Sequence, residues 1–172
     1  MLQNKMKTYH SFSSKETELL GGAIARDVLR AKTRPKGGAL IFALRGDLGS
    51  GKTTFVKGFF RGLGVKSRVK SPTFIIMRRS AIRGKIFRNV FHIDAYRIRK
   101  TAPAESSRGT KPDDLFLIDF KSVASDPRNI IIIEWPENMK GIIPRGARRL
   151  EFLHGKKENE RTIKYKSIFI KN

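Results

Sequence analysis

Short apolar runs that end in polar or glycine-rich residues are the clearest pattern in the chain. Residues 39–44 are apolar throughout, and residues 129–135 contain four consecutive isoleucines. Continuous apolar runs of this length are typical of strands buried on both faces of a parallel sheet. Residues 85–94 alternate only in part and follow a turn signal at residues 83–85, which predicts a hairpin that begins near Phe74. The pattern therefore predicts a sheet with parallel strands at its centre.

Apolar residues at helical spacing predict helices between these strands. Residues 13–16 read Ser-Ser-Lys-Glu, the form of a capping box, and the apolar spacing that follows predicts a helix from about Ser14 to Arg30. A second helix is expected over residues 54–61, because glycines follow it. A short third helix is expected over residues 113–120.

The two ends of the chain favour antiparallel strands. Residues 7–12 are compatible with a short edge strand. Residues 148–154 and 161–170 predict a hairpin that turns through the polar residues 155–160. The polar, proline-containing residues 99–114 are expected to form a loop.

A glycine-rich loop joins the predicted strand at residues 39–44 to the predicted helix at residues 54–61. Its sequence, G-D-L-G-S-G-K-T, matches the phosphate-binding P-loop pattern G-x-x-x-x-G-K-[ST]. Glycines let the backbone fold around an anion with its amides pointing inward. The lysine supplies a charge for the β- and γ-phosphates of ATP, and the threonine hydroxyl is a ligand for Mg²⁺. The candidate nucleotide-binding residues are Gly46, Asp47, Gly49, Ser50, Gly51, Lys52 and Thr53.

These elements predict an α/β fold. We expect a P-loop NTPase-like domain with a mostly parallel central sheet flanked by helices and extended by antiparallel hairpins. The chain of 172 residues has no internal repeat and no sign of a second domain, so one domain over residues 1–172 is expected.

Two acidic residues end apolar strands and are candidates for the chemistry of ATP hydrolysis. Glu134 follows the isoleucine run, and Asp94 ends the strand at residues 85–94. Both strands are expected beside the P-loop strand, with their acids at the same edge of the sheet. Glu134 is assigned to Mg²⁺, directly or through water, and Asp94 to the attacking or a metal-bound water. Thr73 is predicted to sense the γ-phosphate.

Composition adds a strong positive charge. The chain has 37 Lys and Arg residues against 15 Asp and Glu, a net charge of +22. Such a field favours contact with a polyanion such as tRNA, but a solvated basic surface explains it equally well. There is no cysteine, no apolar run of membrane-spanning length and no signal-peptide core at the N-terminus, so a cytoplasmic protein with no membrane association is expected.

Four motifs together resemble one family. They are the P-loop, Ser71-Pro72-Thr73-Phe74, the His92-x-Asp94-x-Tyr96-Arg97 cluster and Glu134-Trp135-Pro136, and their order and spacing are similar to those of the TsaE (YjeE) family over roughly residues 13–161. The resemblance implies an Mg²⁺-dependent ATPase, weak without partners and monomeric when free. It would assist the TsaB–TsaD pair in forming threonylcarbamoyladenosine beside the anticodon of tRNAs that read codons beginning with A.

The resemblance also implies roles for individual residues. Lys52, Thr53 and Glu134 would keep the roles given above. Thr54 would lie beside the phosphates, and residues 71–73 and 92–97 would form two switches. Further nucleotide contacts are implied for three residues: Ser14, Trp135 and Arg161. The stretch 101–112 is longer than the family pattern predicts.

Two other functions fit parts of the sequence. The first is a small-molecule P-loop kinase, in which residues 99–111 would form an arginine-containing lid. The second is a basic tRNA-binding module whose P-loop has only a regulatory role. A GTPase is less consistent with the sequence, because no N-K-x-D motif follows the P-loop.

Overall fold

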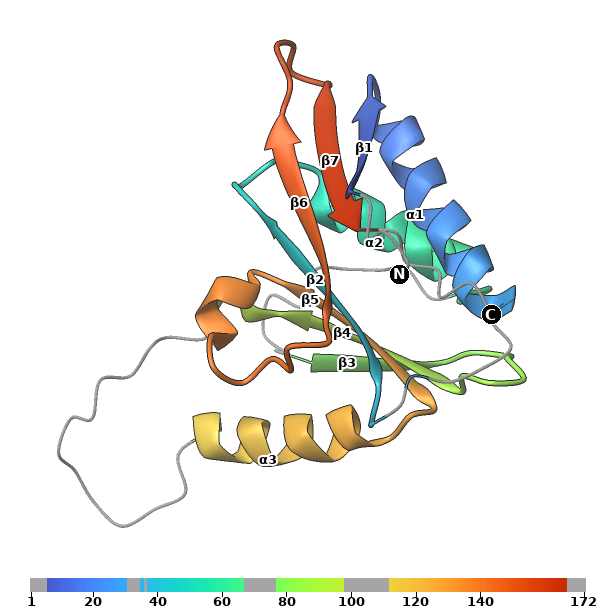
Figure 1. Cartoon of the computed structure of the whole chain (residues 1–172), viewed down its shortest axis with the longest axis vertical. Coiled ribbons are helices and arrows are strands. Elements are labelled where there is room, and N and C mark those ends of the chain that lie inside the picture. The colour runs from blue at the N-terminus through green and yellow to red at the C-terminus, as the bar shows by residue number, and fades with distance from the viewer. Residues whose placement is uncertain (1–5, 31–34, 36, 67–76, 98–111, 167–172) are drawn as a thin grey trace, which may run out of the picture.

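The computed structural model describes residues 6–30, 35, 37–66, 77–97 and 112–166, with only the backbone given for residues 97 and 112–118 (Figure 1). A seven-stranded sheet forms its centre, in the order β1-β7-β6-β2-β5-β4-β3. The strands are β1 (Met6–Ser11), β2 (Leu40–Gly46), β3 (Met77–Ala81), β4 (Asn89–Asp94), β5 (Asn129–Glu134), β6 (Arg148–His154) and β7 (Arg161–Lys166).

The strand directions confirm the predicted sheet. β6, β2, β5 and β4 are parallel to one another, whereas β1 pairs antiparallel with β7, β7 with β6 and β3 with β4. One expectation was wrong: β4 does not lie beside the P-loop strand β2, because β5 lies between them. An inner place between β2 and β4 suits β5, because its apolar run is buried at all six residues, as only an inner strand allows.

Three α-helices and two short 3₁₀ helices complete the described fold. They are α1 (Ser14–Arg30), α2 (Lys52–Gly62), η1 (Ala95–Arg97), α3 (Pro112–Ser125) and η2 (Pro136–Met139). One half of the predicted capping box is present at α1, where Ser13 Oγ accepts a bond from the Glu16 amide; Glu16 Oε2 accepts from the amide of Phe12, one residue before the cap. α3 extends five residues beyond its predicted end, because Val123 and Ala124 still pack against the core.

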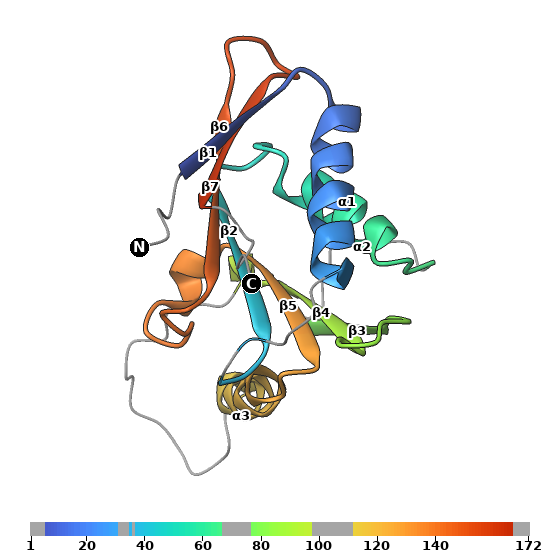
Figure 2. The ribbon, with the colours of Figure 1, turned by 45° about the vertical axis from the view of Figure 1, so that its right-hand side comes forward.

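The sheet separates two apolar clusters. α1 and α2 cover one face, where Phe55 and Phe59 pack against Phe42 of β2 and Phe152 of β6. On the other face, Phe120 of α3 belongs to a smaller cluster with alternate residues of β4 and β5. Figures 1 and 2 show that α3 lies across only part of its face, below the central strands. This leaves the outer half of that face, over β6, β7 and β1, without a described α-helix.

Two glycines, Gly21 on α1 and Gly58 on α2, allow these helices to approach closely. A Cβ atom added to Gly58 would lie 2.0 Å from the carbonyl oxygen of Glu18, and one added to Gly21 would lie 2.3 Å from that of Phe55. Both contacts are with backbone, which cannot move aside without separating the helices. The pair holds α2, and thus the start of its first turn, in place against the sheet.

We therefore expect Gly58→Ala to destabilise the fold, because the two helix backbones must separate. The expected loss is about 2 kcal/mol of unfolding free energy, a typical cost of overpacking. Chemical denaturation measures it. Gly146→Ala is the control, since a Cβ there meets no atom within 4 Å. Equal stability of the two variants would contradict the close helix contact.

Several predicted features lie outside the described residues. These are Thr73 with the rest of the Ser71–Phe74 motif, and residues 99–111 with the candidate lid. Among the residues that are described, no helix has the length and apolar character needed to cross a membrane.

Candidate nucleotide-binding site

The P-loop begins at Gly46, the last residue of β2, and ends at Thr53 in the first turn of α2. Gly49 and Gly51 have φ angles of 75° and 96°, a left-handed conformation that other residues rarely adopt. Ser50 between them is fully buried, and its Oγ has no hydrogen-bond partner among the described residues. An orphaned hydroxyl inside a loop of this shape fits a bound phosphate, which would satisfy it.

Lys52 lies beneath this loop as a buried cation. Its Nζ donates to the carbonyl oxygens of Gly46, at 2.7 Å, and Asp47, at 2.8 Å, and lies 4.0 Å from the ring centroid of Trp135. Burial lowers the pKa of Lys52, while the negative charge of Glu134 opposes that shift. The ammonium group is thus desolvated and held by neutral groups, so a phosphate would gain a strong interaction with it.

Glu134 joins the P-loop helix to the neighbouring strands. Its carboxylate is buried; Thr53 Oγ1 donates to Oε2 at 2.8 Å, and His92 Nε2 lies 2.9 Å from Oε1. The strand register brings these side chains together, because Glu134 pairs with Leu44 of β2 on one side and with Asp94 of β4 on the other. A hydroxyl and a carboxylate side by side are the hard oxygen donors that suit Mg²⁺. No cluster of three or more His, Asp or Glu suited to a metal occurs among the described residues, so an ion here would need phosphate or water ligands as well.

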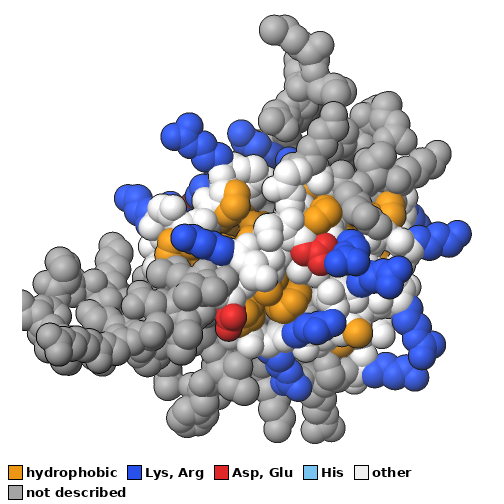
Figure 3. Space-filling model, turned by 90° about the horizontal axis from the view of Figure 1, so that it is seen from below, with side chains coloured by type: hydrophobic (Ala, Val, Ile, Leu, Met, Phe, Trp, Pro, Cys, Tyr) orange, Lys and Arg blue, Asp and Glu red, His pale blue; other side chains and the backbone are white. Residues whose placement is uncertain are grey.

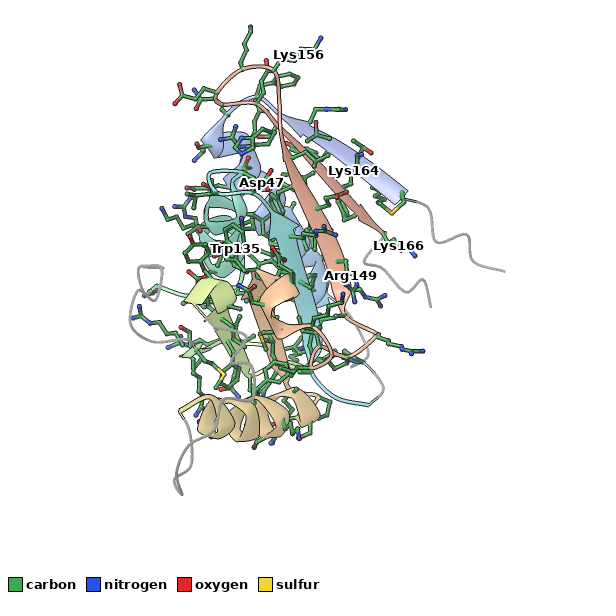
Figure 4. The ribbon with its side chains drawn as sticks, turned by 90° about the vertical axis from the view of Figure 1, so that its left-hand side faces the viewer. Asp47, Trp135, Arg149, Lys156, Lys164 and Lys166 are labelled. Atoms are coloured by element: carbon green, nitrogen blue, oxygen red, sulfur yellow. The ribbon has the colours of Figure 1, made fainter. Side chains whose placement is uncertain are left out.

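Asp94 and two aromatic residues form the adjacent wall. Asp94 is half-buried, and its Oδ1 accepts a bond from the Tyr96 amide at 3.1 Å. The Tyr96 ring lies 5.0 Å from that of Trp135. Trp135 itself has a φ of 58°, the one left-handed non-glycine residue among those described. This strained conformation turns the indole toward Lys52, on the same side of β2 as Asp47 (Figure 4).

The hairpin of β6 and β7 also contacts the P-loop, through residues other than those of the wall formed by Asp94, Tyr96 and Trp135. Arg161 Nη2 donates to the carbonyl oxygen of Gly49 at 2.8 Å, and its Nη1 donates to that of Glu160 at 2.7 Å. His154 Nε2 lies 3.1 Å from the carbonyl oxygen of Leu48. The side chains of Arg161 and His154 therefore bind carbonyl oxygens on the outer side of the loop. The amides of the loop remain available to an anion.

Arg161→Ala should weaken ATP binding without preventing folding. The side chain orders the P-loop through Gly49 but lies partly in solvent, which weakens the bond, so we expect a loss of about 3- to 10-fold in affinity, the value of one ordinary hydrogen bond. Titration with ATP measures it. Arg78→Ala on exposed β3 is the control; an equal affinity in both variants would show that Arg161 does not order the loop.

Most of the predicted site residues come together around the P-loop. Asp94, Glu134, Trp135 and Arg161 surround the loop, and Thr54 lies on the first turn of α2. Ser14 begins α1, but the α1 residue nearest the loop is Thr17, whose Cγ2 would lie 3.6 Å from a Cβ at Gly51. The role of Ser14 stays a prediction.

Sequence reasoning missed three contacts. Thr17 and His154 carry no motif, and they approach the loop only through packing of α1 and the β6–β7 hairpin. His92 was expected in a switch, but its bond to Glu134 was not foreseen. Alternation along the strand at residues 89–94 gives a clue, since it sets His92 and Asp94 on the same face.

Comparison with known proteins agrees with this geometry. The family model described as "Threonylcarbamoyl adenosine biosynthesis protein TsaE" matches residues 11–163. A crystal structure of Bacillus subtilis YdiB is similar in fold, with a TM-score of 0.64 over 96% of this chain and 87% of that one, at 22% sequence identity.

Curated relatives are similar over about three fifths of the chain. The tRNA threonylcarbamoyladenosine biosynthesis protein TsaE of Haemophilus influenzae is 33% identical over 62% of this chain and 58% of its own length. The protein of the same name from Aquifex aeolicus is 45% identical over 60% of this chain and 62% of its own length. The matched region is thus less than two thirds of these relatives. Because the family model covers most of the chain, the chain belongs to the TsaE family.

Proposed function

We propose that this protein binds and hydrolyses ATP with Mg²⁺ and thereby assists a TsaB–TsaD pair in forming threonylcarbamoyladenosine on tRNA. The observation that carries the proposal is the contact of Thr53 with the buried Glu134 carboxylate, directly after Lys52. A P-loop lysine, a hydroxyl and a strand-end acid are the groups that a P-loop ATPase needs at its phosphates. The family described above is named for threonylcarbamoyladenosine biosynthesis, which supports the pathway.

The first task of the site is to hold the triphosphate. The amides of the P-loop and the Ser50 hydroxyl would bind phosphate oxygens, and Lys52 would exchange backbone carbonyl partners for phosphate. Arg161 and His154 would keep the loop carbonyls turned away from the phosphates. With the carbonyls bound in this way, only hydrogen-bond donors would face the phosphates.

The second task is to position Mg²⁺ and water. Bound Mg²⁺ supplies charge stabilisation at the phosphates. Thr53 and Glu134 would hold the ion, and the bond from His92 would fix the Glu134 carboxylate in the required orientation. Asp94, at the end of β4, would orient water, because its strand ends at the same edge of the sheet.

The test is formation of threonylcarbamoyladenosine by the purified TsaB–TsaD pair with tRNA over many turnovers. We expect this protein with ATP to raise the amount formed, and Glu134→Gln to remove that effect. A kinase would instead transfer the γ-phosphate of labelled ATP to a small molecule. Product formation unaffected by this protein would contradict the proposal.

A further inference from the structure

A basic groove lies on the sheet face opposite α1 and α2. It has a volume of about 530 Å³ and is lined by residues of β1, β2, β6 and β7 and by the segment from η2 to Ile143. Strand alternation produces it: Phe42 and Leu44 of β2 face the helices, so Ala43 and Arg45 face the groove. Figure 4, which looks onto this side of the molecule, shows Arg149, Lys164 and Lys166 on β6 and β7.

Cations dominate the groove lining. Five positive residues line it against two acids, and none of the five forms an ion pair with a described residue: Arg45, Lys140, Arg149, Lys164 and Lys166. Glu151 lies in register between Arg45 of β2 and Lys164 of β7, so this acid is outnumbered by its cationic neighbours on the adjacent strands. The concave surface therefore keeps an excess of positive charge, which its low-dielectric walls strengthen.

The groove is separate from the nucleotide site but adjoins it. Neither the P-loop glycines nor Lys52 and Thr53 line the groove, and Gly51 lies beside Thr17 of α1 and Arg161 of β7. Its wall includes Pro136 and Glu137 of η2, which directly follow Trp135. A second anion can thus bind there while the P-loop holds a nucleotide.

The chemistry of the groove favours nucleic acid over protein. Three of its five cations are lysines, which are depleted from protein interface cores but serve as point charges for phosphates. Its lining contains no aromatic residue, the kind of anchor that dominates protein interfaces. Positive charge is also abundant elsewhere, as a view of another side shows (Figure 3), and a chain with net charge +22 attracts any polyanion.

We propose that this groove binds the phosphate backbone of RNA. Arg45, Arg149, Lys164 and Lys166 form a cationic strip across neighbouring strands, and Met6 and Ile143 give it an apolar border. In a protein that acts on tRNA modification, the strip would contact tRNA itself. The identification of tRNA rests on the proposed function, whereas RNA binding by the groove does not.

The test measures the binding of a tRNA transcript to the full chain. Fluorescence anisotropy gives the affinity over a range of salt concentrations. The variant carries Arg149→Glu, Lys164→Glu and Lys166→Glu. We expect its affinity to fall at least tenfold, and the slope of log K against log salt to become shallower by about 2 to 3, because each phosphate contact contributes about 0.7 to 0.9.

The control reverses three exposed lysines away from the groove: Lys57→Glu, Lys85→Glu and Lys121→Glu. It has the same net charge, so a loss equal to that of the groove variant would show binding by a diffuse field and overturn the proposal. Absence of RNA binding by the unaltered protein would also overturn it. So would a groove variant that binds tRNA normally but no longer binds the TsaB–TsaD pair, since the groove would then be a protein interface.

ATP binding is measured in parallel on all variants. Retained ATP binding by the groove variant shows that the site and the fold are intact. Because RNA binding is measured without ATP, a protein that binds RNA through the groove yet hydrolyses no ATP would refute the proposed function and leave this inference standing.

Discussion

Replacing Lys52 with alanine is expected to lower the affinity for ATP by about 100-fold or more, an effect near 2.7 kcal/mol. The variant removes the buried cation beneath the P-loop; Lys52 is only 4% solvent-exposed, so its ammonium group is already desolvated. A phosphate that enters the loop would lose its charged partner and gain none in exchange. The protein should remain folded, because burial disfavours the charged form of Lys52 and removing it relieves that cost.

Trp135 gives a direct measurement of this effect. It is the one tryptophan of the chain, and Lys52 Nζ lies 4.0 Å from its ring, so its fluorescence should change when phosphate draws the ammonium away. Titration with ATP then compares Lys52→Ala with the unaltered protein. Lys57→Ala, on the exposed side of the same helix, is the control. Equal ATP affinity in the unaltered protein and in Lys52→Ala would refute the phosphate site.

Replacing Glu134 with glutamine should slow ATP hydrolysis by about 100-fold or more, the usual cost of removing a group that stabilises transition-state charge. ATP binding should change only a few-fold, because Lys52 and the loop amides remain. The substitution keeps the side-chain shape, and the amide can still accept from His92 through its oxygen and donate to Thr53 Oγ1 through its nitrogen, but it removes the charge that would hold Mg²⁺. Steady-state ATP turnover at saturating Mg²⁺ measures it.

Asp94→Asn tests the second acid in the same assay and should also slow turnover while sparing ATP binding. Glu151→Gln, an exposed acid on β6, is the matched control and should hydrolyse ATP normally. Normal turnover in both Glu134→Gln and Asp94→Asn would contradict the assignment of these acids to metal and water. Loss of ATP binding in Glu134→Gln would instead assign the carboxylate to the architecture of the loop.

The central fold could be predicted because its signals are local. The apolar run at residues 39–44 and the isoleucines before Glu134 each indicate a strand buried on both faces, and the capping box places the start of α1. The order of the strands is not local information. An apolar strand shows that it is buried but not which neighbour it pairs with, so β4 was expected one position too close to β2.

In the site, too, the residues that carry local signals could be predicted and those that depend on the packing of distant elements could not. Lys52 and Glu134 follow from a motif and from the rule that parallel strands end at one edge of the sheet. The contacts of Thr17 and His154 with the P-loop depend on how α1 and the β6–β7 hairpin fold back, which no short pattern encodes. The turn of Trp135 over Lys52 requires a left-handed backbone that a tryptophan rarely adopts, so only the three-dimensional structure reveals it.

The most direct test of the account is the rate of ATP hydrolysis by the purified protein, alone and with its cognate TsaB–TsaD pair. We expect the protein alone to hydrolyse ATP slowly and the rate to rise when the pair is added. The Glu134→Gln variant should show no such rise. Failure to bind the pair, with turnover unchanged by it, would contradict the proposed role and leave a P-loop protein whose function lies elsewhere.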